Sequence, residues 1–234
     1  MDRFVDALSD RYRCWNLDLR GHGASDRAPG AYQPRDYASD VAAALDHIGL
    51  PTIGVGHSLG GGCLVSVGAA GHEHLAAAYA LDPNLFPGRS PPTAMASIFA
   101  KQLAMLRQFQ PEGRPVDDYE AVLGAAPYVG GGTNHDAMVP QQLRGRAESL
   151  SMLDPECLHR LITSDKPNVP NPTPALAIPL RVVAADPTLG AVFRPEHADL
   201  LRQSTPNAEV ETLAGVGHQL MMIRGFDDKV SADL

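Results

Sequence analysis

The stretch Gly56-His57-Ser58-Leu59-Gly60 stands between two apolar runs and decides the fold expected for this chain. The preceding run, 53–55, is typical of a short buried strand, and the following run, 63–67, is typical of a packed helix. A serine between two glycines at such a junction is held in a strained turn with its hydroxyl exposed. We therefore expect Ser58 to be a nucleophile, and we expect both flanking glycines to let strand and helix pass closely.

We expect the start of the helix after Ser58 to stabilise a negative charge. The backbone N–H of Leu59 would point at an oxyanion formed next to Ser58, and the helix N-terminus contributes partial positive charge. The five residues alone are a weak signal, because a chain with 22 glycines produces loose matches by chance. A glycine-rich turn without chemistry explains them equally well.

Length, charge and cysteine content limit the classes of protein. The 234 residues suit one large α/β domain, or a domain with an inserted subdomain. A formal net charge of −8, with both signs spread along the chain, disfavours a nucleic-acid partner. No apolar run approaches the ~20 residues that span a bilayer, so we expect no membrane partner. Three cysteines without metal-like spacing, and no signal peptide, predict reduced thiols in the cytoplasm.

Strands and helices alternate along most of the chain. Strands are expected at 14–18, 53–55, 75–81, 180–184 and 209–213, and helices at 3–12, 34–48, after the elbow, at 195–203 and at the C-terminus. This alternation predicts an α/β fold with a mostly parallel sheet covered by helices. Between 88 and 177 the pattern changes to helices and loops, which predicts a helical lid inserted into a core of 1–87 and 178–234. The proline-rich stretch 166–172 is expected to be a stiff return connector.

Three polar residues follow three different strands. Asp186 comes after 180–184 and His218 after 209–213, so both should lie at the sheet edge that holds Ser58. A histidine can take the serine proton near neutral pH, and an aspartate on its other ring nitrogen fixes its tautomer. We expect the serine Oγ to lie within about 3–4 Å of the histidine Nε2, with Asp186 facing Nδ1. Asp82 also ends a strand and is the alternative acid, expected nearer the lid hinge with its carboxylate toward backbone N–H groups there.

A further mark is the stretch Asp18-Leu19-Arg20-Gly21-His22-Gly23-Ala24-Ser25-Asp26. Together with the elbow, Asp186 and His218, it is similar to the α/β-hydrolase superfamily, specifically to its lid-bearing serine members, and the resemblance covers nearly the whole chain. The resemblance implies that Ser58 forms an acyl-enzyme with an ester or similar acyl bond of a small, largely apolar substrate. It implies no cofactor and no metal, and a monomer or a homo-oligomer. His22 is expected to hold its own loop, and His57 to pack under the elbow or line the pocket. Six lid residues would line an apolar pocket or form the core of the lid itself: Met95, Phe99, Leu103, Met105, Phe109 and Tyr128.

The chain departs from that family at its beginning. Family members start with three strands, and a His-Gly loop after the third gives a second oxyanion N–H; no His-Gly precedes Arg13 here. The missing strand would lie between 14–18 and 53–55, leaving two buried edges with unpaired backbone groups and a poorly stable fold. We expect sequence upstream of Met1 to supply it. The alternative function is a non-catalytic or crippled hydrolase-fold binding protein.

Overall fold

The computed structural model describes residues 2–85, 93–128, 130–163 and 175–234. Within them no helix combines the length and the apolarity needed to cross a bilayer. The elements, in chain order, are α1 (Asp2–Leu8), α2 (Pro34–Ile48), β1 (Thr52–His57), α3 (Leu59–Ala69), β2 (Leu75–Leu81), α4 (Thr93–Glu112), α5 (Val116–Ala125), α6 (Asn134–Ala137), α7 (Pro140–Met152), α8 (Pro155–Thr163), β3 (Leu180–Ala184), the 3₁₀ turn η2 (Pro187–Leu189), α9 (Pro195–Ser204), β4 (Glu209–Thr212), η3 (Leu220–Met222) and α10 (Phe226–Asp233).

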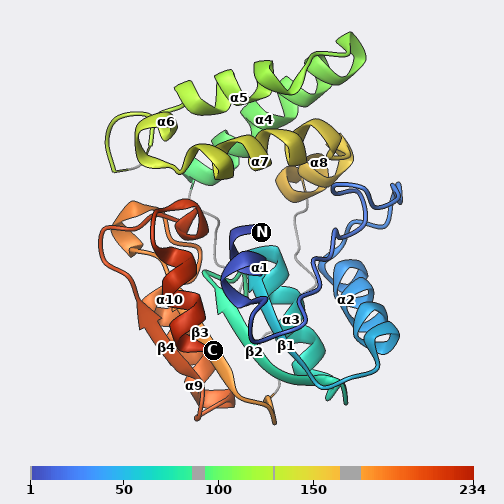
Figure 1. Cartoon of the computed structure of the whole chain (residues 1–234), viewed down its shortest axis with the longest axis vertical. Helices are drawn as coiled ribbons and strands as arrows, with labels where there is room; N and C mark the ends of the chain where they lie inside the picture. The colour runs from blue at the N-terminus through green and yellow to red at the C-terminus, as the bar shows by residue number, and fades with distance from the viewer. Residues whose placement is uncertain (1, 86–92, 129, 164–174) are drawn as a thin grey trace.

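Four parallel strands form one sheet in the order β1-β2-β3-β4 (Figure 1). The sheet is covered on both faces, as the alternation of elements predicts. Alternate residues of β2 and β3 pack with α2, α3 and α9 on one face, and the intervening residues pack with α1 and α10 on the other. Because both faces are buried, these strands are almost entirely apolar rather than alternating with polar residues, with Arg181 of β3 as the exception. The α/β fold class is therefore confirmed.

The expected strand at 14–18 is wrong. These residues form no ladder, and β1 is an edge of the sheet that pairs only with β2 among the described strands. Trp15 is 51% exposed and Ile53 of β1 is 38% exposed. Residues of α1, of 12–16 and of β1 line a cavity of about 340 Å³ between them. The segment is apolar enough for a strand, but it has no neighbouring backbone to pair with. The described sheet has one edge here, half-exposed, rather than two buried ones. The helix expected at 3–12 is also shorter, because α1 ends at Leu8 and a turn follows.

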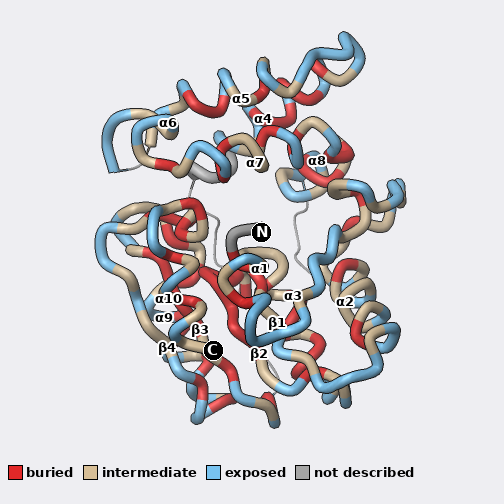
Figure 2. The backbone as a smooth tube through the Cα atoms, viewed as in Figure 1, coloured by how far each residue is buried: buried red, intermediate tan, exposed pale blue. Residues whose placement is uncertain are grey.

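Five helices, α4 to α8, follow β2 and precede β3 in the chain, and they lie above the sheet (Figure 1). Residues 93–128, 130–163 and 175–177 contribute no strand to the main sheet. The proline-rich connector at 166–172 and the boundary at 88 lie outside the described residues. Figure 2 shows buried residues between these helices as well as in the sheet. Their apolar core extends to Leu59 of α3 and to Met221 and Met222 of η3, so the helices pack directly over the elbow.

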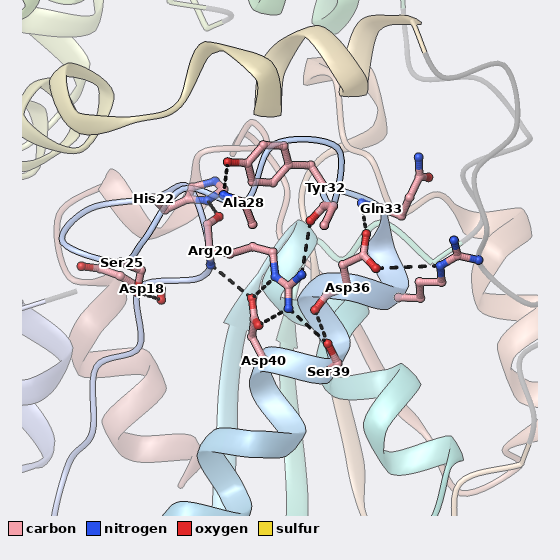
Figure 3. A network of polar contacts seen from close by, with 12 residues as sticks. Asp18, Arg20, His22, Ser25, Ala28, Tyr32, Gln33, Asp36, Ser39 and Asp40 are labelled. Atoms are coloured by element: carbon pink, nitrogen blue, oxygen red, sulfur yellow. Dashed lines mark hydrogen bonds and ion pairs between the residues drawn. The ribbon is translucent and has the colours of Figure 1, made fainter.

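The loop from Asp18 to Gln33 joins the sheet domain to this helical segment. Figure 3 shows the Arg20 guanidinium directed at Asp40 of α2, with Nε 2.8 Å from Oδ2 and Nη2 2.6 Å from Oδ1. On the other side of the loop, the Tyr32 hydroxyl donates to Asp154 Oδ2 (2.7 Å). The Asp154 N–H donates to the Gly21 carbonyl (2.8 Å). The loop is therefore held from below by α2 and from above by the start of α8.

Replacing Arg20 by glutamine should lower the free energy of unfolding by about 1–2 kcal/mol at neutral pH, because it removes a paired, partly buried charge. Burial would raise the pKa of Asp40, but the hydrogen bonds from Arg20 hold it below its ordinary value. That lowered pKa stabilises the fold above the unfolded-state pKa of about 4, and the contribution is lost as the pH falls through the folded-state value. Urea unfolding of wild type and Arg20→Gln should therefore converge in acid. Arg35→Gln is the control, since Arg35 lies 3.9 Å from Asp36 with a 70% exposed side chain and should change stability little. A difference that grows on acidification would contradict this account.

Candidate active site

Ser58 sits in a strained turn between β1 and α3. Its φ is +50° and its ψ is −108°, a conformation that costs a non-glycine residue about 1–3 kcal/mol. The Ser58 N–H donates to the Leu81 carbonyl of β2 (2.9 Å), and the Ser58 carbonyl accepts the N–H of Gly62 (3.0 Å) as the first bond of α3. The turn is thus the strand-to-helix elbow that the sequence predicts.

The glycines around Ser58 are not equivalent. A Cβ on Gly56 would lie 2.5 Å from the Gly60 carbonyl carbon and 2.7 Å from the Gly61 nitrogen, which is backbone that cannot move aside cheaply. A Cβ on Gly60 would meet nothing within 4 Å. The expectation that both glycines are required for close passage is therefore corrected. Gly56 is required, and the second close approach belongs to Gly61, whose Cβ would lie 2.9 Å from the Gly56 carbonyl oxygen.

His218 pairs with Asp82 rather than with Asp186. The His218 Nδ1 lies 2.6 Å from Asp82 Oδ2, and both side chains are buried. Because an ionised carboxylate only accepts hydrogen bonds, Nδ1 carries the proton, and Nε2 of the neutral ring is left as a proton acceptor. This is the state that a general base beside a serine needs.

Asp82 is a fully buried carboxylate with four donors. Besides His218, the backbone N–H of Val192 donates to Oδ2 (2.9 Å), while those of Ala185 (3.2 Å) and Phe193 (3.1 Å) donate to Oδ1. Burial would raise the pKa of Asp82, but the hydrogen bonds from His218 and from the backbone bring it below its ordinary value. The carboxylate is therefore ionised at neutral pH and is held in a fixed orientation. The expectation that it would face the start of the inserted segment is wrong.

Asp186 is half-buried and supports a loop instead of touching the histidine ring. Its Oδ1 accepts the N–H (2.8 Å) and hydroxyl (2.6 Å) of Thr188, and its Oδ2 accepts the N–H of Gly215 (2.8 Å). These bonds lower the pKa of Asp186. Asp186 also donates its own N–H to the Val216 carbonyl (2.7 Å). It therefore fastens the loop that leads to His218 from outside, and the expectation that it faces Nδ1 is overturned.

The backbone at Asp82 explains why the carboxylate that pairs with His218 follows β2. Asp82 has a φ of +40°, and it shares positive φ with Ser58 alone among the described non-glycine residues. Its N–H still donates to the Val183 carbonyl of β3 (2.8 Å), so the chain leaves the sheet only after this residue. The unusual φ turns the carboxylate beneath the loop of His218. Neither Ser58 nor Asp82 is a glycine, although both have positive φ. In the sequence this becomes informative only once the dihedral angles are known, because positive φ is uncommon outside glycine.

His57 contacts the loop that carries His218. Its Nε2 lies 2.8 Å from the His218 carbonyl oxygen, and the two rings are tilted by 37° with centroids 4.6 Å apart. Since a carbonyl only accepts, Nε2 of His57 carries a proton. Desolvation and the neighbouring His218 ring lower the pKa of His57, which keeps it neutral. The expectation that His57 packs at the elbow matches this geometry.

Three further expectations concern the Ser58–His218 distance, the Leu59 N–H and a metal site. Among the hydrogen bonds of the described residues, none joins the Ser58 hydroxyl to His218, so the expected distance of about 3–4 Å stays a prediction. Leu59 begins α3, and its N–H is one of the helix-terminal donors that have no carbonyl partner within the helix. In the described part of the chain, no three His, Cys, Asp or Glu side chains gather as metal ligands do.

The apolar residues of the helical segment form its core. Leu103, Met105 and Phe109 are buried in the cluster that joins the helices, and Phe99 and Tyr128 pack against it. The side chain of Met95 lies outside the described ones. Two cavities, of about 540 and 340 Å³, are lined by other residues. Of the two interpretations of these side chains, the core of the helical segment is the one that the packing favours.

Several solved structures share this architecture, and two of them are named as a deformylase and a hydrolase. An N-formylmaleamic acid deformylase from Pseudomonas putida S16 superposes with a TM-score of 0.73 at 16% identity, over 99% of this chain and 84% of that one. An E-2-(acetamidomethylene)succinate hydrolase gives a TM-score of 0.69 at 19% identity, over 98% of this chain and 85% of that one. At these identities the likeness shows the fold alone.

A curated relative is more similar over a short stretch. The 2-(acetamidomethylene)succinate hydrolase of Mesorhizobium japonicum is 44% identical over 54 residues, which are 23% of this chain and 19% of that protein. The match spans about a fifth of the relative's length. The family model of the alpha/beta hydrolases matches residues 1–231, nearly the whole chain. The elbow, the parallel sheet and this match lead to one conclusion: the chain belongs to the alpha/beta hydrolase family.

Proposed function

We propose that this protein is a serine hydrolase that cleaves an ester or similar acyl bond of a small substrate through an acyl-enzyme. Ser58 attacks the acyl carbonyl while His218 Nε2 takes its proton. Asp82 holds the His218 ring and stabilises its protonated form. The Leu59 N–H stabilises the oxyanion, and His218 returns the proton to the leaving group. Water then repeats these steps on the acyl-enzyme and releases the acid.

The observation that supports this most strongly is the buried pair of Asp82 and His218 beside the elbow. Burying an ionised carboxylate costs free energy, even when four donors, one of them the His218 N–H, contact its two oxygens. A positive charge that develops on the His218 ring during the reaction explains why such a carboxylate is placed there. The strained φ at Ser58 and at Asp82 supports the same assignment, because strain persists where a site needs it.

The substrate class rests on the comparisons and on the helices above the elbow. The deformylase and the acetamidomethylene succinate hydrolase are named for small acids that carry an acylated nitrogen. We propose a similarly small acyl compound here, an ester or an amide. Helices α4 to α8 would act as a lid, since their core includes Leu59 and Met221 on either side of the site and gives it an apolar wall. We also propose a cytoplasmic location, which the three free cysteines favour.

A fluorophosphonate probe tests the proposal, because it reacts with an activated serine. Wild type should be labelled at Ser58 and Ser58→Ala should not, whereas Ser66→Ala should be labelled like wild type. Ser66 is the matched control: it lies in the same helix α3 and its hydroxyl donates to the Gly62 carbonyl (3.0 Å). A folded wild-type protein that is not labelled, and that binds p-nitrophenyl esters saturably without hydrolysing them, would reject the hydrolase and favour the non-catalytic binding protein.

A further inference from the structure

Arg146 reaches from α7 to the residue that follows the catalytic histidine. Its Nη1 donates to Gln219 Oε1 (3.3 Å), and its charge adds a smaller contribution to the lowered pKa of His57, after desolvation and His218. The start of α7 is fixed nearby, because the Val139 N–H donates to the Met222 carbonyl of η3 (3.2 Å). Figure 1 shows α7 on the side of the helical segment that faces the sheet. The guanidinium is therefore held beside the proposed site from above.

This guanidinium has no carboxylate partner in the described part of the chain. Arg144, two residues earlier on α7, contacts Asp117, Glu120 and Glu148. Arg20 and Arg181 are paired as well, and their pKa values, like that of Arg144, lie above the ordinary value. Arg146 is half-buried and makes one side-chain bond, to a neutral amide; burial lowers its pKa. A cation that is partly desolvated and has no counter-charge is stabilised when an anion binds beside it.

The unused donors of Arg146 remain within reach of a ligand. A guanidinium has five N–H donors, and Gln219 accepts one of them. No Arg146 nitrogen is among the buried described atoms that lack a hydrogen-bond partner, so the other donors face solvent or a ligand. Since Gln219 uses its oxygen toward Arg146, its amide NH₂ is free to donate as well. Two neighbouring donor groups thus lie next to His218.

The charges around Arg146 favour an anion there. The two rings nearest the site, His57 and His218, are neutral or positive and add no repulsion. Asp82, the carboxylate that pairs with His218, is fully buried, and each of its oxygens already accepts two hydrogen bonds. A planar guanidinium fits a carboxylate with two parallel hydrogen bonds, a geometry that a lysine does not offer.

We propose that Arg146, with the amide of Gln219, binds a carboxylate of the substrate and so selects small acyl compounds that carry an acid group. This subsite rests on the proposed hydrolase function, because it places the acyl carbonyl at Ser58 by holding the far end of the same molecule. It also gives α7 a role beyond covering the site: the helix delivers the specificity residue.

The experiment compares p-nitrophenyl hydrogen succinate with its methyl ester, which has the same leaving group but no carboxylate. Wild type should favour the acid. Arg146→Gln should lower kcat/KM for the acid about 10- to 100-fold, mainly through KM, and leave the methyl ester unchanged. The kcat/KM of Arg146→Lys for the acid should lie between those of wild type and Arg146→Gln. Arg144→Gln, on the same helix but paired with carboxylates away from the site, should match wild type with both esters.

Two results would overturn the subsite: equal hydrolysis of both esters by wild type, or equal losses with both esters in Arg146→Gln, which would indicate a structural role. Calorimetric titration with succinate separates this from failure of the hydrolase itself. If wild type is neither labelled nor active but binds succinate, and Arg146→Gln does not bind it, the carboxylate subsite stands without the hydrolase. If wild type is inactive and does not bind succinate, both proposals are rejected.

Discussion

Replacing Asp82 by asparagine should lower turnover about 10⁴-fold, whereas Asp186→Asn should leave it nearly unchanged. An asparagine cannot satisfy the four donors that converge on Asp82. With its oxygen toward His218 and Val192, its NH₂ group would face the N–H groups of Ala185 and Phe193. With the amide reversed, its NH₂ would face Nδ1 and force the proton onto Nε2, the nitrogen that must accept the serine proton.

Turnover of a p-nitrophenyl ester, measured with both variants, decides between the two aspartates. The rate of fluorophosphonate labelling should follow the same order, since it also depends on proton removal from Ser58. Circular dichroism must show that Asp82→Asn is folded, because the backbone donors of Asp82 also support the turn after β3. Equal turnover of Asp82→Asn and wild type, with a large loss in Asp186→Asn, would return the acid role to Asp186.

The Gly56→Ala substitution should destabilise the fold by on the order of 3 kcal/mol, a large part of the roughly 5–15 kcal/mol that holds a typical domain together. The added methyl would lie 2.5–2.7 Å from the backbone of Gly60 and Gly61, and no side-chain rotation relieves such a contact. Strand β1 and helix α3 would have to separate at the elbow.

Gly60→Ala is the matched control, because a Cβ at Gly60 meets nothing within 4 Å and alanine is favoured over glycine in a helix. Urea unfolding should therefore give Gly60→Ala a stability equal to or slightly above that of wild type. Two variants with the same midpoint would show that the elbow does not depend on contact between β1 and the first turn of α3.

The sheet and the elbow could be predicted from the sequence because local patterns determine them. The largely apolar runs at β1 to β3 are short and bounded by turns, and the glycine spacing around Ser58 is distinctive. The stretch at 14–18 has the same apolar character but is not a strand, because strand formation depends on a neighbour that residue composition does not reveal. Likewise, the apolar side chains between Met95 and Tyr128 suit a pocket wall and a helical core equally, and only their packing distinguishes the two.

The acid could not be assigned from the sequence for a specific reason. Asp82 and Asp186 both end a parallel strand and both precede a proline, so their local signatures are the same. What separates them is a dihedral angle of +40° at Asp82 and the direction of one carboxylate. Arg146 gave no signal either, as one of 19 lysines and arginines. Among the described residues, its distinction is to be half-buried without a counter-charge, whereas other arginines without an ion pair, such as Arg107 and Arg224, are exposed.

The register of β1 and β2 has a consequence for how such a protein can diversify. His57 and Leu81 are opposite each other in the ladder, and Ser58 and Asp82 are the next residues along each strand. Each gives its N–H to the adjoining strand, 2.9 Å from Leu81 O and 2.8 Å from Val183 O. The spacing of Ser58 and Asp82, the proposed nucleophile and acid, is therefore set before the chain enters the inserted helices. A lineage can lengthen, shorten or exchange α4 to α8, and with them the proposed substrate contacts, while Ser58 and Asp82 keep their positions.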